Sequence, residues 1–188
     1  MNHLHLKNRG LSTVVTTLII LVVSVLLAGV VTMYATNITS TRTQAESLKV
    51  TNQHIWVYDN GNAILGVVID NVGGRDVVIS GIQVRGVVSP WTDVYFDKVS
   101  SAVSGNLNLN STALIDQVSF VYVTGTPAGT FTQGTANQPL TLVSGSTIVI
   151  YIASPDNISQ NDIGGTVGIT TFTQNAQYYV ECNVKAAA

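Results

Sequence analysis

Charged residues are scarce in this sequence. Asp, Glu, Lys and Arg make up 10 % of the 188 residues, against about 25 % in an average soluble protein. There is no basic run or patch, and the formal net charge is −2, so nucleic-acid binding is not expected. Ser, Thr, Val, Gly and Asn take up the difference, which predicts a neutral, hydroxyl-rich surface.

Cysteine and histidine are also nearly absent. Cys182 is the only cysteine, which excludes an internal disulfide. We expect it to be a small apolar residue in the last strand, with pairing between chains as the alternative. His3 and His5 stand at the very start of the chain, which leaves His54 without companions for a zinc site. No metal site is therefore predicted.

Motifs of catalysis are missing as well. Asp70 and Asp76 flank a turn with Arg75 between them, and their spacing does not match a calcium loop. A salt bridge within the turn, or solvated carboxylates, is the expectation there. No nucleophile elbow accompanies the serines. We predict that the protein is not an enzyme and that it needs no cofactor.

One long apolar run dominates what is present. No charge lies between Arg9 and Arg42, and Leu11–Tyr34 is apolar-leaning throughout. As a helix this run would span ~36 Å, enough to cross a ~30 Å hydrocarbon core. Apolar residues on all its faces predict burial all round, in lipid or among neighbouring helices.

The same run carries small residues that favour close packing between helices. An ordinary single-pass anchor without self-association is the alternative. Because residues 37–50 contain no Pro or Gly, the helix is predicted to continue as a stalk to about Val50, with Arg42 and Glu46 paired on one face. The predicted packing positions are Ser24, Ala28, Gly29 and Ala35.

A short polar peptide, MNHLHLKNRG, precedes the apolar run. A secretory signal peptide has an apolar region of ~7–15 residues followed by a small-residue cleavage site. Here the run is longer, and the small residue, Gly10, lies before it. Lys7 and Arg9 would hold the N-terminus in the cytoplasm, so an uncut membrane anchor is one interpretation.

The segment Lys7-Asn8-Arg9-Gly10 followed by Leu11-Ser12-Thr13-Val14-Val15 resembles the class III, prepilin-type signal of archaeal type IV pilins. The resemblance implies that a membrane-embedded aspartyl peptidase cuts after Gly10, so that the mature chain begins at Leu11 and keeps its helix. It also implies assembly into a homopolymeric filament by a pilus assembly machinery. Val15 stands where bacterial type IV pilins usually carry Glu, which fits the archaeal branch.

From His54 onward the apolar period becomes that of strands, with polar turns between them. Asn60-Gly61 predicts a hairpin, and Gly81 a bulge. Eight or nine short strands predict a β-sandwich of immunoglobulin-like type. The expected strands are 54–58, 63–70, 77–80 continued after the Gly81 bulge as 82–88, then 93–96, 119–123, 140–143, 147–153, 167–173 and 178–184.

Two longer stretches, Ser100–Asp116 and Thr124–Gln138, are rich in Ser, Thr, Asn and Gly. Loops of this length often have an interface or surface role, and mobile linkers are the equal alternative. The turn and strand Asn71–Ile79 also resembles the globular domain of archaeal pilins and archaellins, where an Asn/Gly turn precedes a β-branched strand.

The predicted fold class is α+β, with a long N-terminal hydrophobic helix followed by an all-β immunoglobulin-like sandwich. Residues 1–10 form the expected leader, 11–53 the assembly helix and stalk, and 54–188 the globular head. Three N-x-S/T sequons are candidate glycosylation sites, two in loop-like sequence expected outside the membrane (Asn110 and Asn157) and one on the helix near what would be a crowded interior (Asn37).

The sequence thus predicts a pilin, a structural subunit of an extracellular filament for surface adhesion, with a membrane-embedded precursor. The pilin resemblance leaves two alternatives open. One is the archaellin of a motility filament, which shares the helix and the sandwich head. The other, from a different class, is an uncut, membrane-anchored domain that binds a partner at the cell surface.

Overall fold

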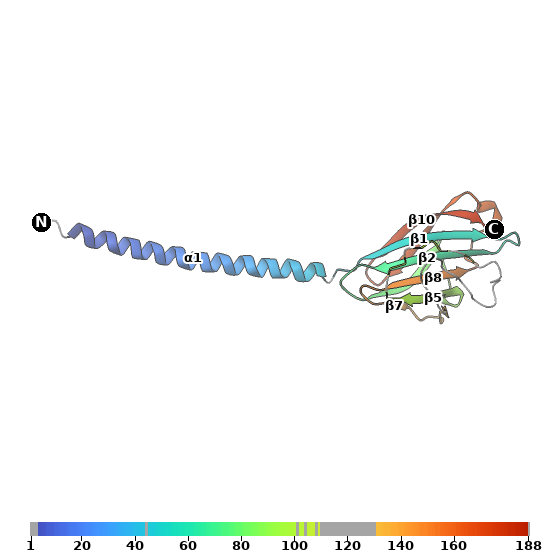
Figure 1. The fold of residues 1–188 in the computed structure, drawn as a ribbon, viewed down its shortest axis with the longest axis horizontal. Helices are drawn as coiled ribbons and strands as arrows, with labels where there is room; N and C mark the ends of the chain where they lie inside the picture. Colours follow the sequence, from blue (N-terminus) through green and yellow to red (C-terminus); the bar gives the residue numbers. More distant parts are fainter. Residues whose placement is uncertain are drawn as a thin grey trace. The chain divides into compact units, whose positions relative to one another are not determined.

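The computed structural model describes residues 4–43, 45–100, 102–103, 105–107, 109 and 131–187 (Figure 1). The chain divides into two compact units, Met1–Thr43 and Gln44–Ala188. We call the first the helix unit and the second the head, and describe each by itself.

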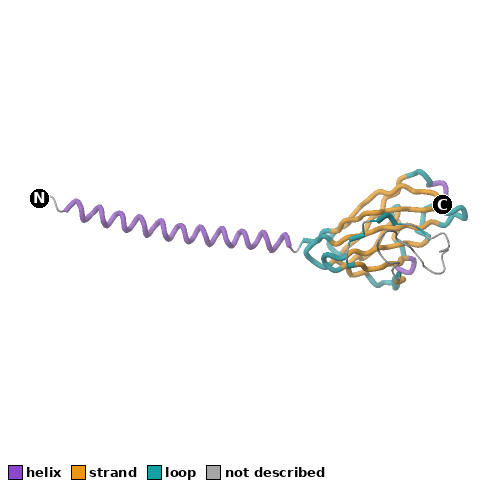
Figure 2. Tube along the Cα trace, in the orientation of Figure 1, coloured by secondary structure: helices purple, strands orange, loops and turns teal. Residues whose placement is uncertain are grey.

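The helix unit is one continuous helix, α1 (Leu4–Thr43), coloured purple in Figure 2. It includes the predicted run Leu11–Tyr34 and begins ahead of Gly10. The predicted continuation to Val50 is wrong, because strand β1 (Leu48–Val57) starts there. Leu48 is buried in the head and pairs with Asn71 on the neighbouring strand, so sheet pairing decides the conformation of this segment.

Two further predictions fail with that boundary. The head begins before His54, since β1 already includes Leu48 and Val50. Glu46 lies outside α1, so it does not form the predicted helical pair with Arg42. Its carboxylate instead accepts hydrogen bonds from Thr173 and Asn175 of the head.

The described head is a mixed sheet of ten strands with the order β4-β3-β9-β10-β1-β2-β8-β5-β6, in which β7 pairs with β3. The predicted strand 119–123 lies outside the described residues. After β1, the strands are β2 (Ala63–Asn71), β3 (Val77–Val84), β4 (Val87–Val88), β5 (Val94–Val99), β6 (Thr132–Gln133), β7 (Leu140–Leu142), β8 (Thr147–Ala153), β9 (Thr166–Thr173) and β10 (Gln177–Ala186). Two short 3-10 helices, η1 (Trp91–Asp93) and η2 (Gln160–Asp162), lie in the connections.

Two local predictions from glycine are confirmed. The β1–β2 hairpin turns at Asn60-Gly61, where Tyr58 N donates to Asn62 O over 2.8 Å and Gly61 has a φ of +86°. The β3–β9 register shifts between Ile79 and Gly81, which is the expected bulge. At Gly61, glycine supplies a positive φ that other residues adopt only at a cost.

The sheet curls so that its two halves enclose one apolar core. The halves meet where β1 and β10 run parallel, over Ile55–Val57 and Val184–Ala186. A single buried cluster joins Ile55, Val67 and Ile150 of one half to Ile79 and Ile169 of the other. This arrangement confirms a helix followed by a β-rich, sandwich-like head.

A second buried cluster covers the outer face of β2 and β8. It contains Val68, Val149 and Tyr151 from the strands together with Val103 and Leu107 from the predicted loop 100–116. Asn52 Nδ2 donates to Gly105 O over 2.9 Å and fixes this loop on the sheet. The central strands are therefore buried on both faces, which explains their almost unbroken apolar sequences.

Candidate functional site

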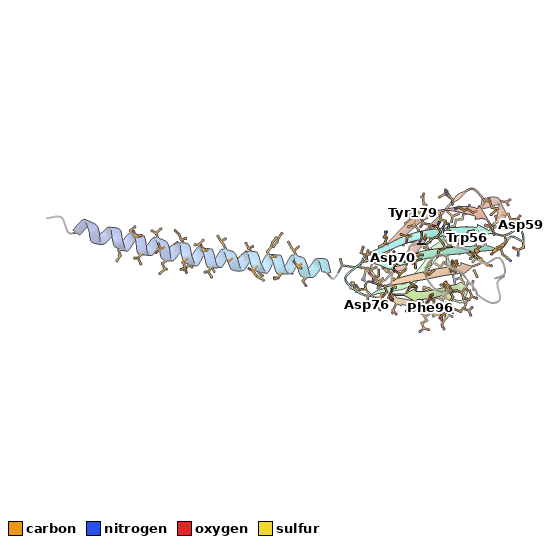
Figure 3. All side chains as sticks on the ribbon, in the orientation of Figure 1. Trp56, Asp59, Asp70, Asp76, Phe96 and Tyr179 are labelled. Atoms are coloured by element: carbon orange, nitrogen blue, oxygen red, sulfur yellow. The ribbon has the colours of Figure 1, made fainter. Side chains whose placement is uncertain are left out.

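Most of the large apolar side chains that the described chain exposes lie on α1. Large apolar side chains from Leu11 to Ile38 are between 41 % and 74 % exposed, and they project on every side of the helix (Figure 3). Leu11–Ser40 is long and apolar enough to cross a membrane, and none of this segment is buried within the chain. Such a surface needs lipid or other protein around it.

Six Ser and Thr hydroxyl groups of α1 donate to carbonyl oxygens of the helix itself. Ser24 Oγ donates to Ile20 O over 2.7 Å, and Thr32 Oγ1 donates to Ala28 O over 2.7 Å. Thr16, Thr17, Thr36 and Thr39 make equivalent bonds one turn back. Back-bonding removes the cost of burying these hydroxyls in an apolar environment. Sequence reasoning missed these bonds, although they could have been predicted, because each of these Ser and Thr residues lies within the predicted helix.

The predicted packing residues all lie on α1. Ser24, Ala28, Gly29 and Ala35 are exposed, and a Cβ atom at Gly29 would meet nothing within 4 Å in the single chain. Their positions are those from which a neighbouring helix can approach closely. The predicted cleavage point is also within α1, between Gly10 and the exposed Leu11.

The three sequons fall in different places. Asn37 lies in α1, and Asn110 lies outside the described residues. Asn157 is exposed in the connection before η2 and has a φ of +65°. The residue after it, Ile158, is buried in the core, and Ser159 donates its hydroxyl to Asp162. The Asn157 sequon therefore belongs to an ordered turn with its asparagine outward.

An ion pair that the sequence analysis missed braces this turn. Arg85 Nη1 donates to Asp162 Oδ1 over 2.7 Å and to Asn157 O over 2.9 Å. The backbone N–H of Ser159, then the Arg85 guanidinium, lower the pKa of Asp162 below its ordinary value. Arg85 lies in the β3–β4 turn, far from Asp162 in sequence, so no local sequence pattern predicts this ion pair.

Asp162→Asn should destabilise the head at neutral pH and matter less in acid. A folded-state pKa below the ordinary 3.8 means that the ionised carboxylate stabilises the head above about pH 4 and that this contribution is lost as pH falls through the lowered value. Urea midpoints of wild type and variant, measured in detergent at about pH 7 and about pH 2.5, should converge at the lower pH. A gap of equal size at both pH values contradicts the assignment, and Arg85→Gln should shift the neutral-pH midpoint in the same direction.

Asp70 and Asp76, both labelled in Figure 3, do not form the salt bridge that was one expectation for this turn, whereas the exposed Asp76 agrees with the other, a solvated carboxylate. Thr147 Oγ1 donates to Asp70 Oδ1 over 2.6 Å, and the Ser144 backbone N–H donates to Asp76 Oδ1 over 2.9 Å. No ion pair joins Arg75 to Asp70 or Asp76, all three of which the structure describes, so a salt bridge in the turn is not found. These carboxylates fix the connections between strands.

His54 and Cys182 line one shallow hollow of about 360 Å³, together with Glu181 and Lys185. Burial, then the Lys185 charge, lower the pKa of His54, and burial raises the pKa of the Cys182 thiol. Cys182 is 5 % exposed, in agreement with its predicted place in the last strand. Among the residues described, no group of three His, Cys, Asp or Glu side chains is placed to hold a metal ion.

Comparisons with known proteins give no family. No protein-family model and no curated protein sequence matches the chain. Among solved structures, a copper-bound PCuAC domain from PmoF2 is similar at 14 % identity, over 76 % of this chain and 98 % of that one, with a TM-score of 0.30. A likeness at that level supports no statement about the fold or function of this chain.

Proposed function

We propose that this chain is an archaeal type IV pilin-like subunit, cut after Gly10 and polymerised through α1 into an extracellular filament for surface adhesion. The observation that carries the proposal is the exposed apolar surface around the whole of α1, on a helix whose hydroxyls bond to its own backbone. Such a helix suits a precursor held in lipid and a filament core made of neighbouring copies.

Burial of α1 by its neighbours would hold the filament together. At ~25 cal/mol per Å² the apolar area of such a helix supplies tens of kcal/mol before entropy costs, as an upper bound. The small residues Ser24, Ala28, Gly29 and Ala35 would form the closest contacts. Head-to-tail contacts of this kind need not close into a ring, so the assembly can grow in one direction.

The leader supports a filament over a simple anchor. Gly10 stands directly before the apolar run, where a prepilin peptidase would cut and leave the helix on the product. An anchor that is never cut has no need of this arrangement. An immunoglobulin-like head, neutral and hydroxyl-rich, belongs to the same proposal, with glycans on Asn157 and Asn110 at its surface and Asn37 as a further acceptor on the helix.

Material recovered from the cell surface should begin at Leu11. The measurement is N-terminal sequencing together with intact mass, and glycosylation would place the mass above that of the polypeptide. Electron microscopy of the same fraction should then show filaments.

Two other outcomes overturn the proposal. Protein that begins at Met1 and stays in the membrane fraction would indicate the anchored binding domain. A start near Thr36 would mean ordinary signal-peptide cleavage and a head without the helix that assembly needs.

A further inference from the structure

The three residues Ala45-Glu46-Ser47, which we call the junction segment, are the first described residues of the head and are held on both sides. Ser47 O accepts the backbone N–H groups of Val72 and Gly73, each over 3.0 Å. Ala45 O accepts the N–H of Gly74 over 3.2 Å. The β2–β3 turn therefore donates three hydrogen bonds to the backbone of the junction segment.

The Glu46 side chain fastens the same segment to a second turn. Its carboxylate accepts the Thr173 hydroxyl and, over 3.1 Å, the Asn175 amide. Thr173 is the last residue of β9 and Asn175 lies in the β9–β10 turn that follows, in the other half of the curled sheet. Hydrogen bonds to a charged acceptor are stronger than those between neutral groups. The junction segment thus bridges the two halves of the head at the point where the chain enters.

The Asn71-Val72-Gly73-Gly74 turn is built to receive this segment. A Cβ atom at Gly73 would lie 2.6 Å from both Ala45 O and Ser47 N, so only glycine fits there. Asn71 is buried; its Nδ2 donates to Arg75 O and Leu142 O, and its Oδ1 accepts the Gly73 N–H. A buried amide with these three bonds fixes the turn in its shape.

Without the hydrogen bonds of the junction segment, the N-terminal part of β1 would be held only by its pairing with β2 when force is applied to its N-terminal end. Residues Leu48–Thr51 pair with β2 alone, and pairing with β10 starts only at Ile55. The β1–β2 register also shifts between Thr51 and His54. The Leu48–Asn71 pair lies at the N-terminal end of β1, so tension on the preceding chain acts on it before the other pairs of the strand.

We propose that the junction segment and the two turns form a mechanical clamp, which passes tension from α1 into both halves of the head and keeps β1 from peeling away. The clamp has a role wherever α1 is anchored while the head binds something else. It rests on that anchoring, in a filament or in a membrane, and does not depend on cleavage after Gly10.

The test is single-molecule pulling of the full chain in detergent, with handles at the two termini. Glu46→Ala should raise the unfolding rate at constant force about tenfold, the change that corresponds to about 1.4 kcal/mol of barrier. Glu181→Ala is the matched control, because that exposed carboxylate accepts a hydrogen bond from Tyr179 on its own strand, whereas the half-buried Glu46 bonds to residues of other elements. Its unfolding rate should stay at the wild-type value.

A second pair of variants separates the clamp from general destabilisation. Gly73→Ala forces the turn away from the junction segment, whereas at Gly81 the nearest atom to a new Cβ is 4.0 Å away. For Gly73→Ala and Glu46→Ala, the unfolding rate under force should rise by more than the loss of stability seen in urea without force would account for. Equal losses with and without force, or wild-type rates for Glu46→Ala, overturn the clamp. Neither readout involves processing or filaments, so failure here leaves the filament proposal standing, and the reverse holds as well.

Discussion

Gly10→Val is expected to leave the chain uncut and to abolish filaments. In the proposed mechanism the peptidase must bring the backbone at Gly10 and Leu11 into its active site, and a β-branched side chain at that point blocks the close approach that glycine allows. The uncut leader would also keep Lys7 and Arg9 attached to the helix, and burying these charges in a bundle of apolar helices is costly. The readout is the mass and N-terminus of the protein in membrane and surface fractions.

Gly29→Val serves as the matched control for that experiment. It places the same substitution on α1, at a position where a Cβ atom meets nothing within 4 Å in the single chain. Processing of this variant should be normal, with a product that starts at Leu11. If Gly29 lies where helices approach closely, filaments should nevertheless become fewer or shorter, which separates assembly from cleavage. Normal cleavage of Gly10→Val would contradict the leader assignment.

The sequence predicts the parts of the structure that depend on local pattern. The uncharged run from Leu11 to Tyr34 predicts a helix because nothing interrupts it, and Asn60-Gly61 predicts a hairpin because few residues other than glycine adopt its φ of +86°. The C-terminal end of α1 was missed for the opposite reason. Leu48 and Val50 fit a helix as well as a strand, and their pairing with Asn71 and Ile69 decides between the two.

Part of the candidate site can likewise be predicted from local sequence, and part of it cannot. The positions on α1 follow from the sequence, whereas the contacts of Glu46 with Thr173 and of Arg85 with Asp162 join residues far apart in the chain. Such contacts depend on strand order, which periodicity does not reveal. The turn at Gly73 was recognised as a turn, yet only the structure shows that the junction segment lies against it.

The second buried cluster, on the outer face of β2 and β8, is a further feature that local sequence pattern does not reveal. Loop 100–116 looks polar, with many Ser, Thr and Asn residues, and mobile linkers were half of the expectation. The apolar residues Val103 and Leu107 of this loop are nevertheless buried in one cluster with Tyr151 and Val149. A Cβ atom at Gly66 would lie 2.9 Å from the Tyr151 ring and 3.1 Å from Leu107, so this glycine makes room for the layer.

Tyr151→Ala is therefore expected to have the largest effect on the stability of the head. The side chain is fully buried; its ring stacks on Trp56 at 6.5 Å and meets Phe131 edge-on at 5.4 Å, between ring centroids. Truncating a buried aromatic costs about 3–5 kcal/mol, against a total of about 5–15 kcal/mol for a domain. The measurement is a urea titration of the full chain in detergent, followed by the fluorescence of Trp56 and Trp91.

Tyr179→Ala is the control, since Tyr179 is 62 % exposed on the outside of β10. Its cost should stay within about 0.5 kcal/mol, as for surface substitutions in general. Tyr151→Phe keeps the ring and should recover most of the stability that alanine loses. If Tyr151→Ala and Tyr179→Ala shift the midpoint equally, the outer layer contributes little, and the loop from Val103 to Leu107 covers the sheet without stabilising it. A large difference instead means that the outer layer stabilises the head, since Leu107 belongs to the same buried cluster as Tyr151 and Phe131 packs against that cluster.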